Sequence, residues 1–334
     1  MNIPFKAREN KAAVAAIGSA LMDFCLYEFA DFVEASGAQV GGMVMVGHTV
    51  IDGVLAKSGN EPSVVPGGSA CNTIVGIGRL GAKARFIGKR GDDELGRRLE
   101  ESIRRAGVEP VLGVSPSATG RVLSIITPDA QRSMLTCLGA SSEMLPEEIK
   151  QSFFEDCAVA HIEGYLLFNP ALLMSALNAA KSAGALVSLD LASYTVVESS
   201  LDTLNKIVDG GLVDILIANE DEAAAFTGLK DESAAAEALG KRAPVAVMKL
   251  GKRGSMILHG GRKAVIAPYG DGRPAVDTTG AGDLWAAGFL YGLVRGYDLE
   301  RCGALGSACG YEVCQVVGAH IPDDGWARIM KSFK

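Results

Sequence analysis

Short apolar segments alternate with helical patterns along most of the chain from residue 64 onward. Four such segments are continuous apolar runs, as expected of strands buried on both faces. They are residues 159–163, 186–190, 213–218 and 245–250. Strands that alternate with helices in this way are typical of a mostly parallel sheet with helices on both faces. The sequence therefore predicts a three-layer α/β/α fold.

Local signals between these segments support the prediction. In residues 93–107 the apolar side chains recur every three or four positions and charged ones occupy the other face, which predicts an amphipathic helix. Asn169 and Pro170 suit the cap and the first position of another helix. Residues 255–267 differ, because two apolar runs flank a pair of glycines. That pattern predicts a hairpin.

Two stretches lack this alternation, at about residues 24–63 and 110–137. Their alternating and β-branched segments predict a small β lid inserted at the edge of the main sheet. A chain of 334 residues has room for two domains. It contains no internal repeat and no Gly/Ser linker, so we expect residues 1–334 to form a single domain with an appended lid.

Composition excludes several classes of partner. The formal net charge is −7, so the chain lacks the basic surface of a nucleic-acid-binding protein. Its seven cysteines are odd in number and include no C-x-x-C pair, which argues against a disulfide framework and a thiolate zinc site. The four histidines lack metal-ligand spacing. We expect a cytoplasmic protein without a nucleic-acid partner.

The start of the chain resembles a signal peptide in one respect only. Lys6, Arg8 and Lys11 precede an apolar run at residues 12–22. Glu9 within the basic stretch and polar breaks in the run argue against a signal peptide, and the strand at 13–17 is the expected alternative. No apolar run reaches the length of a membrane span, so we expect no membrane partner.

A glycine-rich segment, Asp277 to Asp283, carries the strongest chemical signal. It reads D-T-T-G-A-G-D and precedes an apolar run, 284–294, that predicts a helix. Free N–H groups at a helix start suit an anion. A carboxylate at the same point makes sense if it accepts a proton from an attacking hydroxyl while the N–H groups stabilise a transferring phosphoryl group. The alternative is a helix cap at Asp283.

Two other segments suit a ligand with hydroxyl groups. The double glycine Gly67-Gly68 precedes a helix and lets a ligand approach bare backbone, while Asn72 offers both a donor and an acceptor. Asp23 follows the strand predicted at 13–17, where ligand-facing residues of open α/β sheets lie. Its carboxylate suits two neighbouring sugar hydroxyls. The alternative is an ordinary loop aspartate.

One motif points to another function. Residues 76–81 match G-x-G-x-x-G, but they follow a helical stretch instead of a strand. This favours helix packing and a C-terminal cap over a dinucleotide site. A nicotinamide-dependent oxidoreductase stays as a rival that NAD(P) binding would reveal. No G-x-x-x-x-G-K-[ST] is present, so the helix start at Asp283 is the predicted phosphate binder.

Taken together, these motifs resemble those of the PfkB (ribokinase-like) family of carbohydrate and nucleoside kinases, from about residue 13 to residue 320. The resemblance rests on Asp23, Gly67-Gly68, G-K-R-G-D-D at 88–93, D-T-T-G-A-G-D at 277–283, N-E-D-E at 219–222 and K-L-G-K-R-G at 249–254. Within the family, residues 131–134, 138–140 and 163–166 are most similar to bacterial members labelled adenosine kinase or sugar kinase. The resemblance implies a ribokinase-like fold with an inserted β lid.

The resemblance also implies roles for the matching residues. Asp283 would be the catalytic base, with the backbone of Gly280, Ala281 and Gly282 as the anion hole. The acceptor hydroxyls would be held by Asp23, Gly67, Gly68 and Asn72. Arg132 would arrive from the lid and neutralise charge as the lid closes; the alternative is a plain surface arginine.

The nucleotide side is implied in the same way. The residues expected around ATP are Asn219, Glu222, Lys249, Gly251 and Gly254. Glu222 would act on magnesium through waters, since Mg²⁺ keeps part of its hydration shell; the alternative is a solvated glutamate. Asp277 and Thr279 correspond to positions that ligate a monovalent cation, such as potassium, in some members.

We therefore predict an ATP-dependent kinase that phosphorylates a hydroxymethyl group of a sugar or nucleoside, with an adenosine-like acceptor favoured. One alternative is a sugar kinase for ribose, fructose or 2-keto-3-deoxygluconate. An alternative of another class is a catalytically silent nucleotide or sugar sensor. The protein is expected to be a monomer or a homodimer.

Overall fold

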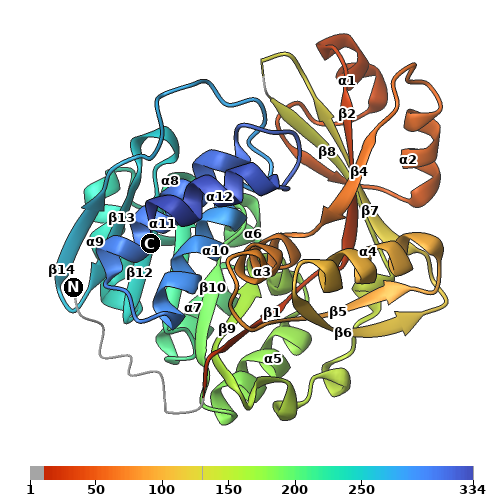
Figure 1. The fold of residues 1–334 in the computed structure, drawn as a ribbon. Helices are drawn as coiled ribbons and strands as arrows, with labels where there is room; N and C mark the ends of the chain where they lie inside the picture. Colours follow the sequence, from red (N-terminus) through yellow and green to blue (C-terminus); the bar gives the residue numbers. More distant parts are fainter. Residues whose placement is uncertain (1–10, 130, 334) are drawn as a thin grey trace.

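A large sheet flanked by helices forms the body of the protein, and a smaller sheet projects from one end (Figure 1). The computed structural model describes residues 11–129 and 131–333, so Lys6, Arg8 and Glu9 of the signal-peptide argument lie outside the described residues. Over these ranges the main sheet has nine strands in the order β14-β13-β12-β11-β10-β9-β1-β5-β6. The strands are β1 (Ala13–Ile17), β5 (Ala84–Gly91), β6 (Val108–Ser115), β9 (Cys157–Glu163), β10 (Leu186–Asp190), β11 (Ile215–Asn219), β12 (Val245–Lys249), β13 (Ser255–His259) and β14 (Arg262–Ile266).

The strand pairing confirms the predicted mostly parallel sheet. β1 lies near its centre, paired in parallel with β5 on one side and β9 on the other. From β9 the sheet continues in parallel through β10 and β11 to β12. Among the described strands of this sheet, β13 alone runs in the opposite direction, and it pairs antiparallel with β12 and with β14, its partner in the predicted hairpin. The order of the strands reverses at β1, and ligands of open α/β sheets bind at such a point.

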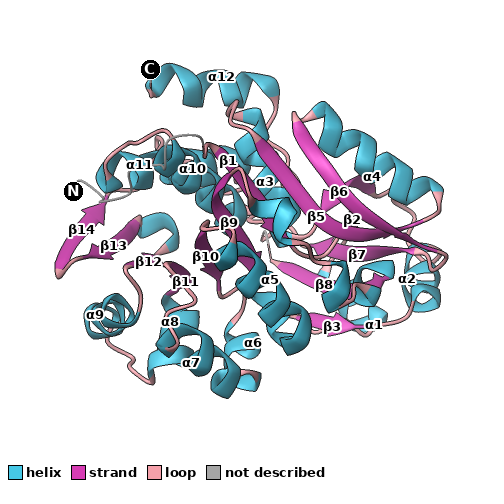
Figure 2. Cartoon of the chain, turned by 90° about the horizontal axis from the view of Figure 1, so that it is seen from below, coloured by secondary structure: helices cyan, strands magenta, loops and turns pink. Residues whose placement is uncertain are grey.

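Helices cover both faces of this sheet, as the three-layer prediction requires (Figure 2). Alternate residues of β1 show the arrangement: Ala15 and Ile17 join one core, while Val14 and Ala16 join the other. The first core includes α5 (Pro170–Ser182), α6 (Tyr194–Ser199), α7 (Leu201–Asp209), α8 (Glu220–Thr227) and α9 (Glu232–Arg242). The second includes α3 (Ser69–Arg79), α4 (Glu94–Arg105), α10 (Ala281–Val294), α11 (Leu299–Val313) and α12 (Asp323–Ser332).

Short 3₁₀ helices link several of these elements. They are η1 (Ala140–Glu143), η2 (Pro146–Glu148), η3 (Gln151–Phe154), η4 (Gly164–Phe168) and η5 (Gly251–Arg253). No helix in the described part of the chain is long and apolar enough to cross a membrane.

The G-x-G-x-x-G match lies mostly within a helix. Gly76 and Gly78 belong to α3, and a Cβ at Gly76 would lie 2.7 Å from that of Ala287 on α10. These glycines therefore serve the close packing of α3, as the helix-packing interpretation expects.

The smaller sheet is the lid, and it has a core of its own. Its order is β3-β8-β7-β2-β4. The strands are β2 (Leu21–Tyr27), β3 (Met43–Met45), β4 (Ser63–Gly67), β7 (Thr119–Ile126) and β8 (Arg132–Gly139). Two helices, α1 (Ala30–Ser36) and α2 (His48–Leu55), pack on its outer face through a cluster that includes Val33, Ile51 and Leu123. The stretch 24–63 thus contributes helices as well as strands.

One boundary of the lid was predicted wrongly. Residues 110–115 were expected in the lid, but they belong to β6, which pairs in parallel with β5 at the edge of the main sheet. The physical reason is that an edge strand is buried on one side only, so β6 has the half-exposed pattern of a lid strand. Pro110 fits this position, because proline is confined to edge strands or bulges.

Candidate active site

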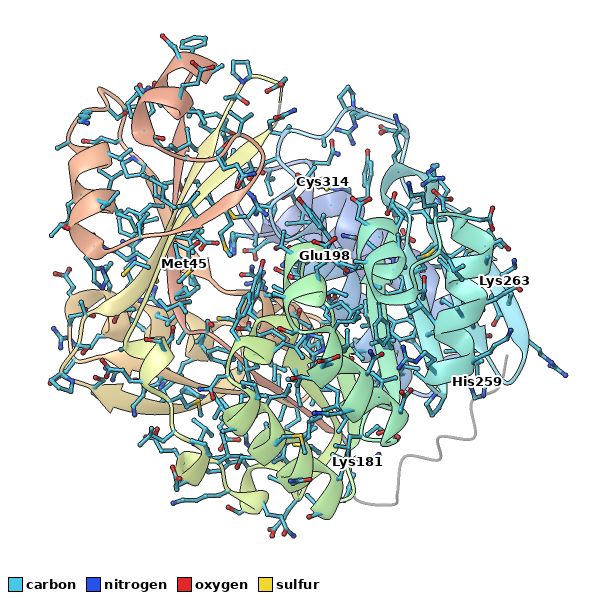
Figure 3. All side chains as sticks on the ribbon, turned by 180° about the vertical axis from the view of Figure 1, so that it is seen from behind. Met45, Lys181, Glu198, His259, Lys263 and Cys314 are labelled. Carbon is cyan, nitrogen blue, oxygen red and sulfur yellow. The ribbon has the colours of Figure 1, made fainter. Side chains whose placement is uncertain are left out.

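A cavity of about 1660 Å³ lies between the carboxyl ends of the main strands and the inner face of the lid. Figure 3 labels Met45 on the lid and Cys314 on the body, and both line this cavity. Of the residues predicted for the site, all except Gly67 and Asp277 line it too. Segments far apart in sequence therefore meet at one place, and the strands β9, β10, β11 and β12 each end there in a polar or charged side chain.

Asp283 lies in the first turn of α10 and faces α3. The N-cap of α10 is Gly280, at φ 73°, where a Cβ would lie 2.5 Å from that of Ala319. Ser69 Oγ donates to Asp283 Oδ1 at 2.8 Å, and Asn72 Nδ2 donates to Oδ2 at 2.9 Å. The helix-cap alternative is thus wrong. Both oxygens are held by another helix instead of by the backbone of α10.

Burial determines the electrostatics of Asp283. It raises the pKa of the carboxyl above its ordinary value, while the hydrogen bonds from Asn72 and Ser69 act in the opposite direction. A carboxylate that has lost water but keeps two donors has a fixed orientation. It is available to a hydroxyl that displaces one of them.

Asp23 lies on β2 and points into the cavity, 6% exposed. Burial raises its pKa to about 7, and the charge of Arg132 opposes that rise. Gly67 explains how the carboxylate fits, since a Cβ there would lie 2.1 Å from Asp23 Oδ1. Gly67 therefore makes room for Asp23 without lining the cavity itself. Gly68, at φ 96°, begins α3, and a Cβ there would lie 2.2 Å from the carbonyl oxygen of Ser19.

Arg132 begins β8, on the lid side of the cavity. Its side chain is half-buried, and the guanidinium makes no hydrogen bond or ion pair with any residue that the structure describes. Its charge nevertheless reaches Asp23 and opposes the rise in that carboxyl's pKa that burial causes. The guanidinium is therefore a cation that faces the cavity, not the plain surface arginine of the alternative.

Lys249 ends β12 beside the start of α10. Its Nζ donates to Asp190 Oδ2 at 2.8 Å, and a Cβ at Gly282 would lie 3.0 Å from that nitrogen. Burial acts to lower the pKa of Lys249, but the carboxylates of Asp190 and Glu222 raise it above its ordinary value. A charged ammonium consequently lies next to the free N–H groups of α10, where it suits a transferring phosphoryl group.

Asn219 and Glu222 form a reciprocal cap at the start of α8. The backbone N–H of Asn219 donates to Glu222 Oε2 at 2.8 Å and its side-chain amide to Oε1 at 2.9 Å. The N–H of Glu222 donates to Asn219 Oδ1 at 2.8 Å. Glu222 is 2% exposed, so the solvated-glutamate alternative is wrong. Burial raises its pKa to about 7, and Lys249 opposes that rise.

Two glycines shape the loop after β12. Gly251 and Gly254 have φ angles of 53° and 95°, and a Cβ at Gly254 would lie 2.0 Å from the carbonyl oxygen of Ile266. Both line the cavity. Tyr269, Trp285, Ser307 and Tyr311 line the same cavity.

The protein side chains alone do not form a magnesium site, so bound Mg²⁺ would need ligands from the ATP phosphates and from water. Among the described residues, no group of three His, Cys, Asp or Glu side chains could hold a metal ion. Mg²⁺ in kinases is bound largely by substrate phosphates and water, so Asp190 and Glu222 at the cavity wall suit contact through water.

The predicted potassium ligands hold each other. Asp277 Oδ1 accepts hydrogen bonds from the N–H and hydroxyl of Thr279 at 2.9 and 2.7 Å, and Oδ2 accepts one from the N–H of Gly318 at 2.8 Å. These bonds organise the turn before α10. The monovalent cation stays a prediction.

The residues of the cavity wall to which the sequence prediction gave no role include Ser69, Glu163, Tyr165 and Asp190. The sequence could have identified Asp190 and Glu163, because each is the last residue of a predicted strand, at the edge of the sheet where the other site residues lie. Ser69 had the weaker signal of its place between Gly68 and Asn72.

The comparisons with known proteins decide the family. Residues 42–324 match the model of the pfkB family carbohydrate kinases. The chain belongs to the PfkB family. It is therefore a phosphotransferase that uses ATP and acts on a hydroxyl group of a sugar or nucleoside, and the oxidoreductase and sensor alternatives are set aside.

Solved structures confirm the ribokinase-like fold. Adenosine kinase from Sinorhizobium meliloti is 30% identical with a TM-score of 0.90, over 97% of this chain and 100% of that one. A probable sugar kinase from Rhizobium etli is 28% identical with a TM-score of 0.91, over 97% and 99%. An Archaeoglobus fulgidus protein named an uncharacterized sugar kinase is 28% identical over 250 residues, 73% of this chain and 96% of its own length. Both kinds of acceptor thus occur among the relatives of this PfkB kinase.

Proposed function

We propose that this kinase transfers the γ-phosphoryl group of ATP to the hydroxymethyl oxygen of a nucleoside, adenosine or a close analogue, in preference to a free sugar. The observation that carries the proposal is a row of side chains across the lid sheet. Asp23 pairs with Val122, Val122 with Thr136, and Thr136 with Met45. All four line the cavity.

The length of this row suits a base attached to a ribose. Neighbouring strands lie about 4.8 Å apart, so Thr136 lies about 10 Å from Asp23 across the sheet. Thr136 Oγ1 is buried and has no hydrogen-bond partner among the described residues. A ribose held by Asp23 ends short of Thr136, whereas the polar edge of its base reaches that far. A buried hydroxyl without a partner is costly, and a base would supply the partner.

Most of the rest of the lid wall is apolar, with Ser124 and Arg132 as the polar exceptions. The side chains that face the cavity from the lid are mainly aliphatic or thioether groups: Leu21, Met43, Met45, Val122, Met134 and Leu138. Such a wall suits the face of a flat aromatic ring, for which methionine is an adaptable contact. A sugar would present hydroxyls to it without partners.

Each catalytic residue then has a defined task. The acceptor hydroxymethyl group displaces Ser69 or Asn72 from Asp283, which accepts its proton late in a loose transition state. Lys249 and the N–H groups at residues 280–282 stabilise the charge on the phosphoryl oxygens. Magnesium, held through water by Asp190 and Glu222, would add positive charge at the ATP phosphates.

The lid is expected to exclude water from the reaction. Water competes with the acceptor for the phosphoryl group, so the cavity has to close before transfer. Arg132 enters from the lid, and its cation compensates phosphate charge only when the lid is near the body. Closure therefore couples acceptor binding to transfer.

A coupled assay of ADP release tests the proposal. Adenosine, other nucleosides, ribose, fructose and 2-keto-3-deoxygluconate are compared as acceptors at equal ATP and magnesium, with Asp283→Asn as the background control. We expect the highest kcat/KM for adenosine and a much lower one for ribose. A free sugar that exceeds every nucleoside would contradict the nucleoside assignment and leave the kinase assignment intact.

A further inference from the structure

Glu163, the last residue of β9, is a buried carboxylate without a task in the reaction described above. It is 0% exposed. Its Oε1 accepts a hydrogen bond from the N–H of Ser19 at 2.7 Å, and its Oε2 accepts one from the N–H of Ala70 at 3.0 Å. The two donors lie on different segments, the loop after β1 and the first turn of α3. One side chain thus joins the two segments that border the acceptor site, the loop before β2 and the start of α3.

The surroundings are shaped to admit this carboxylate. A Cβ at Gly18 would lie 2.2 Å from Glu163 Oε2, so the loop needs a glycine there. Burial raises the pKa of Glu163 to about 7, and the hydrogen bonds from Ala70 and Ser19 oppose that rise. The ionised carboxylate is the form that accepts from both N–H groups.

Glu163 also replaces a missing helix cap. The N-cap of α3 is Gly68, which has no side chain to satisfy the free N–H groups of the first turn. Glu163 accepts from one of them, Ala70 N–H, across a sequence separation of 93 residues. A negative charge at a helix start is favourable as well. The first turn of α3 is therefore anchored from the main sheet.

That first turn holds the catalytic base. Ser69 precedes Ala70 and donates to Asp283 Oδ1, while Asn72 follows it and donates to Oδ2. The second segment, the loop that contains Ser19, leads into β2 and Asp23. A shift of either segment would change the distance between the groups that hold the acceptor and the carboxylate that takes its proton.

We propose that Glu163 is a positioning residue: by accepting hydrogen bonds from Ser19 and Ala70 it sets the register between the acceptor-binding segments and Asp283. The role assigned to it consists of its hydrogen bonds to these two segments. The inference rests on the acceptor site of the proposed function but not on the identity of the acceptor.

Kinetics of Glu163→Gln test this role, because glutamine keeps the shape of the side chain and has only one acceptor oxygen. With adenosine as the probe, or ribose if wild type prefers it, we expect kcat/KM for the acceptor to fall about tenfold or more. The KM for ATP should stay within about twofold. A purely structural role would lower the active fraction and leave both KM values unchanged.

A double variant separates positioning from an independent effect. If Glu163 acts through α3, Ser69→Ala should add little to Glu163→Gln, so the double variant should stay within about threefold of the worse single variant. Independent contributions would multiply. Glu312→Gln is the matched control: Glu312 is also buried but pairs with Arg328 at α12, so the acceptor KM should not change.

Hydrogen exchange provides a readout that needs no acceptor. In Glu163→Gln, peptides that contain the Ser19 and Ala70 amides should lose protection, while peptides of β12 and α11 should not. Glu163→Asp, one methylene shorter, serves if the glutamine variant does not fold. Unchanged acceptor KM together with unchanged exchange at these two amides would overturn the proposal. Absence of turnover in wild type with every probe would instead count against the proposed function.

Discussion

The two walls of the cavity differ in how their polar groups are held. On the body side Asp283 has Ser69 and Asn72, Lys249 has Asp190, and Asn219 has Glu222. On the lid side the guanidinium of Arg132 makes no hydrogen bond or ion pair with a described residue, and Thr136 Oγ1 is buried without a partner. The charged groups of the body wall are paired without a ligand, although Trp285 Nε1 on α10 and Ser307 Oγ on α11 also line the cavity and are buried without a partner among the described residues. The lid wall leaves its polar groups for the acceptor.

This difference separates chemistry from selectivity. Groups fixed by the protein provide the preorganised electrostatics that phosphoryl transfer needs. Groups left unpaired gain most from a ligand that matches them, and they reject one that does not. Substitutions in the body wall should therefore affect all acceptors alike, whereas those in the lid wall should affect acceptors differently.

The largest effect is expected for Asp283→Asn, which removes the base and keeps its shape. General-base catalysis contributes about 10²–10⁴-fold, so kcat should fall at least 100-fold with every acceptor, with little change in the KM for ATP. Steady-state kinetics with adenosine and ribose measure it. Retention of more than about a tenth of wild-type kcat would remove Asp283 as the base.

Asp23→Asn should weaken binding of the acceptor and stabilise the protein at neutral and higher pH. A hydrogen bond to a charged group contributes about 1.5–3 kcal/mol, so the acceptor KM should rise about 10- to 100-fold while the KM for ATP holds. Because burial raises the pKa of folded Asp23 from 3.8 to about 7, the unfolded chain loses this proton first, so stability falls as the pH rises from about 4 to 7 and stays lower above that. The melting temperature of the variant should exceed that of wild type at pH 8 but not at pH 4. An equal difference at both pH values would contradict the assigned cause.

Lys249→Met should lower the stability of the protein without changing its preference between acceptors. It leaves Asp190 buried without its partner, which costs about 3–5 kcal/mol. Calorimetry should show a clear drop in the melting temperature, and the double variant with Asp190→Asn should recover part of it. Activity should fall equally for adenosine and ribose. Recovery of wild-type kcat in the double variant would show that the ammonium is not needed for transfer.

Thr136→Val should have the smallest effect and the most selective one. It removes a hydroxyl and nearly preserves volume, so we expect kcat/KM for adenosine to fall about 3- to 10-fold, as for one hydrogen bond. The value for ribose should not change. Equal losses for both acceptors would place Thr136 outside the base site and weaken the contrast between the walls.

The parts of the fold that the sequence predicted depend on local patterns. Residues 186–190 form β10 as expected, and residues 281–294 form the helix expected after the D-T-T-G-A-G-D segment. Helices α1 and α2 of the lid were missed, because they are short and have no side-chain cap. Their stability comes from packing on the lid sheet, which a local pattern does not record.

The site residues that the sequence missed depend on distant partners. Ser69 and Asp283 are 214 positions apart, and Lys249 and Asp190 are 59 apart. Glu163 resembles any residue at the end of a strand until Ala70 is placed beside it. Loop glycines were predicted by position, but the reason for Gly67, room for the Asp23 carboxylate, appears only in three dimensions.

The central claim is that residues of the body wall catalyse phosphorylation of a hydroxymethyl group, and that residues of the lid wall select the acceptor that carries it. Phosphorus NMR of wild type with ATP, magnesium and adenosine tests it most directly. The account predicts a phosphomonoester resonance split into a triplet by the two protons of a CH₂ group, growing as ADP forms and absent with Asp283→Asn. Formation of ADP with inorganic phosphate alone, or a product resonance of equal size with Asp283→Asn, would contradict it.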